Sequence, residues 1–523
     1  MPQRVTVDSI ESIRPLALAA VTEYTRRLRY LRYCDLRLEI SEGKGASAEN
    51  GQEKSSSEDY GLSLGVRVLA GRNAVAPGYV GRMLGAVDMD RLERVMREAI
   101  QSAHRRALAS AERKATGRSS FGPLGDSLYS TQLAPIPIRQ DTVAAAYRVD
   151  PRTVPLEQVA KMAVDASRRV AALSNQVVYN VVSAATLLTR ELFCSSEGAD
   201  IDQSFAMTEG FVLVVARGPE GNLELYDFVG HQAGWEVAQE GVDRGAIRLP
   251  RLATFAADLA RTTVEVANAP RLRPPDEEVV VVTDPHFNTL VAHEVVGHPS
   301  ELDRALKLET AYAGRSWLLK DLVDNQIGKP VASPLVSAFS DPTMEGYGHY
   351  LYDHEGTPAR RVHHIRNGVY EEFLNSRQTA AVLGVAPNGS FKATDASLVP
   401  LIRMSNTVFA PGDRDPQDII KEVERGYYVA GHRIPSVAES RENFRISAIK
   451  VYEIRNGELG QLYRDGGIMA DSRDYFMRVD AVGNDFRMYP IPNCGKGQPM
   501  QTKRMGNGGP TMRSVAKLMG SGG

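Results

Sequence analysis

Two histidines and a glutamate lie close together in the segment TLVAHEVVGHPSELD, residues 289–303. Imidazole and carboxylate groups at short spacing can bind a metal ion and move protons. On a straight α-helix, however, residues five apart such as His293 and His298 point about 140° away from each other. Gly297 and Pro299 are residue types that favour a bulge or a helix end. We therefore predict a distorted helix that turns His298 back toward His293; the alternative is an ordinary helix with two packed histidines.

The carboxylates of this segment could serve such a site in different ways. Glu294 follows the first histidine directly, so it would lie beside a metal without binding it, placed to accept a proton from water. Glu301 and Asp303 follow the second histidine and could hold a ligand imidazole through its other ring nitrogen. Ordinary solvated helix or surface charges are the competing interpretation for all three carboxylates.

A third protein ligand would have to come from elsewhere in the chain. Catalytic zinc sites commonly use three protein ligands and leave a fourth position for water. The segment PNCGKGQPM places Cys494 between Asn493 and Gly495, in a Gly-rich stretch that suits a tight turn better than core packing. Zinc is the ion we expect for imidazole plus thiolate, although iron or nickel could occupy the same ligands.

The first part of the chain, residues 1–270, has the pattern of an α+β region with a mainly antiparallel sheet. It can be divided further into two subdomains, 1–125 and 126–270. Apolar residues recur at helical spacing and at strand spacing in alternate segments. Helices are expected at 12–33, 88–113 and 155–173, and strands at 35–40, 60–71, 176–192 and 209–218. The polar, Gly- and Ser-rich segment 41–59 is predicted to be a mobile loop.

A proline-rich segment, PRLRPPD at 270–276, is the predicted linker to a second domain, residues 271–523. EEVVVVTDP follows as a buried strand and leads directly into the histidine segment, so this strand-rich domain would carry the metal-motif helix. The tetrapeptide IRNG occurs at 365–368 and at 454–457. Asn-Gly readily adopts a type I′ turn, which predicts two hairpins.

Composition restricts the class of protein. The 523 residues include 62 Lys and Arg against 64 Asp and Glu, which gives no support for nucleic acid or an anionic membrane as partner. No apolar stretch approaches the roughly 20 residues that span a bilayer. Three cysteines far apart in the sequence do not form a disulfide framework. We expect a cytoplasmic protein.

Four ordered motifs resemble the TldD/PmbA metallopeptidases, a family once described as modulators of DNA gyrase. The first is the His-Glu-x-x-Gly-His segment with the carboxylates that follow it. The others are similar to YDHEGTPARR at 352–361, RMSNTVFAPG at 403–412, and VGNDF at 482–486 with CGKGQ at 494–498. His354 replaces an acidic or polar residue of the family's motif, and the CGKGQ element is one residue shorter. Further departures are Pro299, directly after the second histidine, and the long Ser-rich segment 41–59, and these two leave the substrate range and the partner open.

The resemblance implies residue roles. By matching position, His293, His298 and Cys494 would be metal ligands and Glu294 the catalytic base. Because this chain keeps every ligand, it resembles the TldD-like subunits and not the PmbA (TldE)-like subunits that lack the motif. Family members form dimers, commonly one subunit of each kind, so the implied partner is such a sister chain or a second copy.

The expected activity is hydrolysis of small or unfolded peptides by metal-activated water with Glu294 as general base. The alternative from another class is a non-catalytic adaptor whose metal is structural and which pairs with a sister chain or regulates a partner protein. A closed site of four protein ligands would favour the adaptor. A metal-dependent hydrolase for non-peptide amides is a third interpretation, because the ligands do not encode the substrate.

Overall fold

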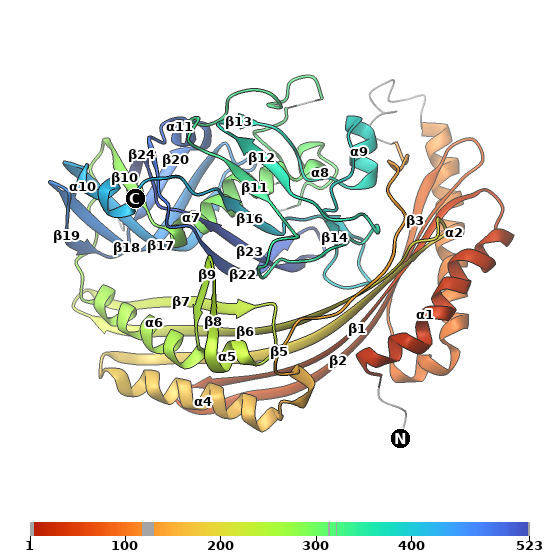
Figure 1. The fold of residues 1–523 in the computed structure, drawn as a ribbon, viewed down its shortest axis with the longest axis horizontal. Helices are drawn as coiled ribbons and strands as arrows, with labels where there is room; N and C mark the ends of the chain where they lie inside the picture. The colour runs from red at the N-terminus through yellow and green to blue at the C-terminus, as the bar shows by residue number, and fades with distance from the viewer. Residues whose placement is uncertain (1–4, 118–129, 312–313, 321, 521–523) are drawn as a thin grey trace.

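The computed structural model describes residues 5–117, 130–311, 314–320 and 322–520. Its first part is built on an extended, curved and mainly antiparallel sheet, and its second part packs over that sheet on the side away from α4 (Figure 1). This arrangement is the α+β class predicted from the sequence. No helix in the described ranges is long and apolar enough to cross a membrane.

The first sheet has the strand order β3-β2-β1-β5-β6-β4, with β7 beside β6. Four of its strands have 19 residues each: β1 Leu31–Glu49, β2 Gln52–Ala70, β5 Val177–Ser195 and β6 Asp200–Gly218. The shorter ones are β3 Ala76–Met83, β4 Gln140–Val143 and β7 Gly221–His231. The packed helices are α1 Ile10–Ala19, α2 Leu92–Gly117, α4 Leu156–Leu173, α5 Glu236–Glu240 and α6 Leu252–Ala267.

The prediction of a mobile loop at 41–59 is wrong. Residues 41–49 continue β1 and residues 52–59 begin β2, joined at Asn50 and Gly51 with φ angles of 50° and 80°. The low apolar content does not prevent strand formation, because β1 is hydrogen-bonded on both sides, to β2 and to β5. The Asn-Gly pair, which marked the two later hairpins, also marks this one.

The helix predicted at 12–33 extends too far at its C-terminal end. Helical structure runs from Val7 to Arg27, with a π-turn at Ala20–Tyr24, and strand β1 begins at Leu31. The helices predicted at 88–113 and 155–173 are confirmed as α2, preceded by a 3₁₀ turn, and α4.

The second part contains two large sheets, with orders β10-β17-β18-β20-β24-β21 and β13-β12-β11-β16-β23-β22-β9-β8. The strands of the first are β10 Glu278–Thr283, β17 Arg425–Val437, β18 Asn443–Arg455 with β19 Glu458–Tyr463 at its side, β20 Gly467–Asp471, β21 Ala481–Val482 and β24 Met512–Met519. Those of the second are β8 Gly241–Arg244, β9 Ile247–Pro250, β11 Ala338–Ser340, β12 Val362–Arg366, β13 Val369–Tyr370, β16 Asn406–Phe409, β22 Arg487–Lys496 and β23 Gln501–Gly509.

Smaller elements connect these sheets. They are α7 Pro285–Val291, α8 Leu302–Ala305, α9 Arg377–Leu383, α10 Pro416–Lys421, α11 Ser472–Met477 and the pair β14 Phe391–Lys392 and β15 Leu401–Ile402. Both predicted IRNG hairpins are confirmed: β12 turns into β13, and β18 into β19, with positive φ at Asn and Gly.

The proposed domain boundary at 270/271 has one structural complication. Strands β8 and β9 precede it in sequence, yet β9 joins the sheet of the second part through Ile247, which lies beside Met488 of β22. The division at 270 therefore stays a proposal. The proposed subdomain boundary between residues 125 and 126 lies outside the described residues.

His364 on β12 makes stability depend on pH. Its Nδ1–H donates to the carbonyl of Glu372 (3.0 Å), and its Nε2 accepts from the hydroxyl of Ser340 (2.8 Å). Burial lowers the pKa of His364 to about 4. Because unfolded histidine titrates near 6.5, acid favours the unfolded chain, and the free energy of unfolding should fall by roughly 1.5 kcal/mol from about pH 6.5 to about pH 5 through this group.

Urea unfolding at both pH values, on wild type and His364→Gln, measures this contribution. The variant should lose that part of the pH dependence, and an unchanged pH dependence would contradict the prediction.

Candidate metal centre

The histidine segment starts as a well-anchored helix. Asp284 caps α7 by accepting a hydrogen bond from the backbone N–H of Phe287 (2.7 Å), and it also accepts from the N–H of Gly431 (2.9 Å). The side-chain amide of Asn288 donates to the carbonyl of Pro510 (2.8 Å). These contacts connect α7 to β17 and to the turn between β23 and β24, so the position of the following residues is set by both sheets.

The helix changes its winding at the first histidine. After α7, residues Ala292–Gly297 form a π-turn and His298–Ser300 a 3₁₀ turn. A π-turn closes hydrogen bonds between residues five apart, so it brings side chains at that spacing onto one side. The ring centroids of His293 and His298 are 4.8 Å apart, and both side chains are buried. The predicted distortion is therefore confirmed.

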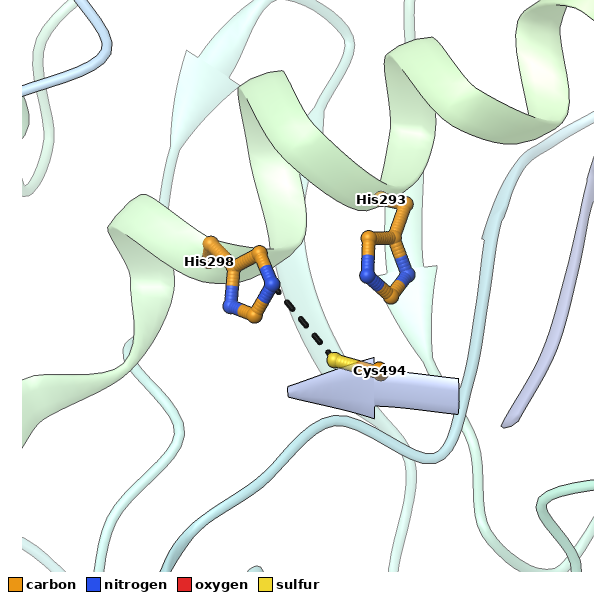
Figure 2. A group of neighbouring side chains, drawn as sticks. All are labelled: His293, His298 and Cys494. Atoms are coloured by element: carbon orange, nitrogen blue, oxygen red, sulfur yellow. Dashed lines mark hydrogen bonds between the residues drawn. The ribbon is translucent and has the colours of Figure 1, made fainter. Parts of the chain in front are cut away.

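Cys494 completes a group of three side chains. Its Sγ lies 3.5 Å from Nε2 of His298, and one donor atom from each of His293, His298 and Cys494 lies within 4.8 Å of the others (Figure 2). Cys494 is on β22, just after an irregularity in the ladder with β23 that falls between Ile491 and Cys494. The guanidinium of Arg403 donates to the Cys494 carbonyl (2.6 Å) and fixes the backbone there.

The charges in this group favour a thiolate. Burial acts to raise the pKa of the Cys494 thiol, but the imidazoles of His293 and His298 outweigh it and hold this pKa well below its ordinary value. Burial acts to lower the pKa of His293, but Cys494 outweighs it and raises this pKa to about 9. Thiolate is the form of cysteine that binds metals, and a cation could take the place of the proton as its partner.

The donor set fits a metal ion. Nδ1 of His293 is buried and has no hydrogen-bond partner in the described part of the chain. Such buried polar atoms are rare and call for an explanation such as an ion. Two imidazoles and a thiolate are donors that suit zinc. The described residues bring three such groups together, from His293, His298 and Cys494.

Glu301 holds the second imidazole. Its Oε2 accepts hydrogen bonds from Nδ1–H of His298 (3.1 Å) and from the guanidinium of Arg304 (2.7 Å), and it pairs with the ammonium of Lys496 (3.1 Å). Burial acts to raise the pKa of Glu301, but Lys496, His298 and Arg304 outweigh it and keep this pKa well below its ordinary value. The role predicted for Glu301 as an imidazole partner is confirmed.

Asp303 has a different role from Glu301. It accepts from Lys496 Nζ (2.6 Å) and from the backbone N–H of Ile402 (3.1 Å), with no hydrogen bond to an imidazole among those described. The surface interpretation is wrong for both carboxylates, because both are buried. Sequence reasoning gave no role to Lys496 or Arg304. Their positions could have indicated them: Lys496 lies inside CGKGQ, and Arg304 directly follows Asp303.

Glu294 lies beside the three-residue group without belonging to it. Its Oε2 is 3.7 Å from Nε of Arg441, a residue that no sequence pattern pointed to. Burial acts to raise the pKa of Glu294, but His298, His293 and Arg441 outweigh it and lower this pKa. The carboxylate is therefore ionised at neutral pH and can accept a proton.

The π-turn packs closely against Met404, and this contact gives a test. A Cβ at Gly297 would lie 1.9 Å from Sδ of Met404. Gly297→Ala should therefore lower the free energy of unfolding by roughly 1–3 kcal/mol, as overpacking does. Urea unfolding measures it, with Gly85→Ala as control because nothing lies within 4 Å of that position. Equal stability of the two variants would contradict this account of the turn.

Comparisons with known proteins identify the family. Residues 276–518 match the family model described as the PmbA/TldA metallopeptidase C-terminal domain. A protein of Methanothermobacter thermautotrophicus named as a metalloprotease is 30% identical over 374 residues, which is 71% of this chain and 75% of that protein. The chain belongs to the TldD/PmbA family.

Two further relatives of this TldD/PmbA member are informative. A protein of Saccharolobus solfataricus named as a zinc metalloprotease TldD homolog is 26% identical over 62% of this chain and 67% of its own. The solved structure of TldE from Thermococcus kodakarensis has a TM-score of 0.66 at 16% identity and covers 94% of this chain and 97% of its own. At that identity the second likeness shows the fold alone.

Proposed function

We propose that this chain is a metal-dependent peptidase in which His293, His298 and Cys494 hold a zinc ion. The observation that carries the proposal is the convergence of three buried donor groups within 4.8 Å, from segments about 200 residues apart, with an ionised carboxylate beside them. When bound, the metal would supply Lewis acidity toward water and toward the scissile carbonyl. Glu301 would keep the His298 ring oriented.

In this proposal Glu294 is the general base. Its carboxylate accepts a proton from the attacking water and passes it to the leaving amine. The low pKa supports the ionised form that the first step needs. Arg441, 3.7 Å from the carboxylate, orients it.

The proposed substrates are small or unfolded peptides bound in extended form. Strand β22, which carries Cys494, is paired with β23 on one side; on the other, among the described strands, it meets β9 only at Met488. An extended peptide could add to this edge through main-chain hydrogen bonds, which would explain broad sequence tolerance.

The protein would act in the cytoplasm as a dimer. Three free, buried cysteines fit a reducing compartment. The proposed partner is a PmbA/TldE-like sister chain or a second copy, and the TldE-like fold supports the first choice. A closed site of four protein ligands would favour the adaptor alternative, whereas the described residues supply three ligand groups.

Metal analysis combined with a peptide-cleavage assay tests this function. Wild type and Glu294→Gln are each purified and assayed on an unstructured peptide, with and without a candidate sister chain. The peptidase proposal expects metal in both proteins and cleavage only by wild type. If the wild-type protein contains metal but cleaves no peptide, either with or without the sister chain, the result would favour the adaptor.

A further inference from the structure

A cavity of about 170 Å³ lies between the first sheet and the strand pair β22 and β23. Met404, which packs against Gly297 of the π-turn, lines it, and so does Pro492, two residues before Cys494. The cavity is therefore next to the candidate metal centre. Its remaining wall includes several charged side chains, and their pairing decides what the cavity can bind.

Most charges in the cavity wall already have partners. The carboxylate of Glu191 accepts from the ammonium of Lys392 (3.0 Å) and from His354 Nε2–H (3.0 Å). The guanidinium of Arg504 donates twice to Glu209 (2.9 and 3.0 Å). These pairs leave little charge free for a ligand.

Lys503 is different. Its side chain lines the cavity and is only partly exposed, yet in the described part of the chain its ammonium has neither a hydrogen bond nor an ion pair. Two carboxylates of the cavity wall, Glu39 and Glu191, act on this ammonium only from a distance, and a partly buried ammonium without a direct contact to an acceptor is costly. Glu39 on β1 also lines the cavity without a hydrogen bond or an ion pair among the described residues.

The position of Lys503 relates it to the metal centre. In the antiparallel ladder of β22 and β23, Lys503 lies directly opposite Cys494. Opposite residues of such a ladder project from the same face, with Cβ atoms about 5 Å apart. The side chain of Lys503 therefore projects from the same face of the sheet as the Cys494 side chain, and it extends into the neighbouring cavity.

We propose that Lys503 binds a carboxylate of the substrate, so that the peptidase prefers peptides carrying a negative charge a short distance from the cleaved bond. This proposal rests on the proposed function and names its substrate class. Two sources supply the same chemistry: the α-carboxylate at the end of a peptide and the side chain of Asp or Glu.

The electrostatics of the cavity favour an anion. Burial and the nearby Glu191 raise the pKa of Glu39 to about 8 although Lys503 acts to lower it, so the neutral form of Glu39 is favoured at pH 7. Burial and the nearby Lys392 lower the pKa of Lys503 to about 8, although the carboxylates of Glu191 and Glu39 act to raise it. An entering carboxylate would give Lys503 the direct ion pair that it does not make with Glu191 or Glu39 in the described part of the chain, and a protonated Glu39 could donate a hydrogen bond to the same carboxylate.

Three peptides of otherwise identical sequence test the proposal: one with a free C-terminal carboxylate, one with a carboxamide, and one with a carboxamide and a nearby glutamate. Cleavage is measured with wild type, Lys503→Met, Lys503→Arg and the exposed control Lys517→Met. Dissociation constants for the same peptides are measured calorimetrically on Glu294→Gln protein with and without Lys503→Met. Thermal unfolding confirms that each variant folds.

We expect wild type to favour a carboxylate-bearing peptide over the neutral amide by roughly tenfold to a hundredfold, in KM and in the dissociation constant. Lys503→Met should remove this preference, so that KM for the charged peptides approaches KM for the neutral amide, and Lys503→Arg should restore part of it. The charged peptide with the lower KM shows whether Lys503 binds the α-carboxylate or the side-chain carboxylate. Equal binding of all three peptides, or an equal loss for all three in Lys503→Met, would overturn the proposal.

The peptidase proposal and the Lys503 proposal can be contradicted independently of each other. Hydrolysis without a carboxylate preference would overturn the role of Lys503 alone. Carboxylate-dependent binding without any hydrolysis would overturn the peptidase activity alone.

Discussion

Replacing Glu294 with glutamine should abolish most peptide hydrolysis while the metal content stays unchanged. Glutamine has nearly the shape of glutamate but cannot accept the proton of the attacking water. General acid–base catalysis contributes roughly 10²- to 10⁴-fold, so kcat should fall within that range. Because Glu294 stands outside the three-residue donor group, the metal stoichiometry should match wild type.

Steady-state cleavage of an unstructured peptide and metal analysis on the same preparation measure both quantities. Glu277→Gln is the matched control, since this exposed carboxyl lies before β10 and away from the centre. Retention of most activity by Glu294→Gln would show that another group is the base. Loss of metal together with activity would show that Glu294 is a ligand.

Replacing Cys494 with alanine should release the metal. The substitution removes the one thiolate of the group and leaves two imidazoles, too few for a stable zinc site. Loss of an outer-shell partner alone typically weakens metal binding by about 10- to 100-fold, and loss of a direct ligand should exceed this. Activity should fall with the metal content.

Competition with a chelator of known affinity measures the change in the metal dissociation constant. Cys194→Ala is the matched control, because Cys194 is equally buried but lies in the core of the first sheet. That control should retain the metal. Wild-type affinity in Cys494→Ala would remove the cysteine from the proposed site.

The local geometry of the histidines could be predicted from the sequence. A five-residue spacing fails on a straight helix, and Gly297 with Pro299 indicated where the winding changes, which is where the structure has its π-turn and 3₁₀ turn. The position of Cys494 could not be predicted from spacing alone. It depends on the pairing of β22 with β23 and of β23 with β16, contacts between segments distant in sequence. The Gly-rich segment made Cys494 a candidate, and the family resemblance assigned it as a ligand.

Other features could not be predicted because they depend on tertiary contacts. The segment 41–59 has few apolar residues, and its strand structure depends on β5, which joins β1 about 140 residues later in the chain. The pair of Lys496 with Glu301 brings together two segments that share no local pattern. Arg441 lies beside Glu294 through the same kind of long-range packing.

X-ray absorption spectroscopy at the metal edge of the purified protein tests the central claim most directly. If His293, His298 and Cys494 hold one ion, the spectrum should contain one sulfur at about 2.3 Å and two imidazole nitrogens at about 2.0–2.1 Å, with one further light atom from solvent. A spectrum without sulfur, or with four protein ligands and no solvent atom, would contradict the proposed open metal centre.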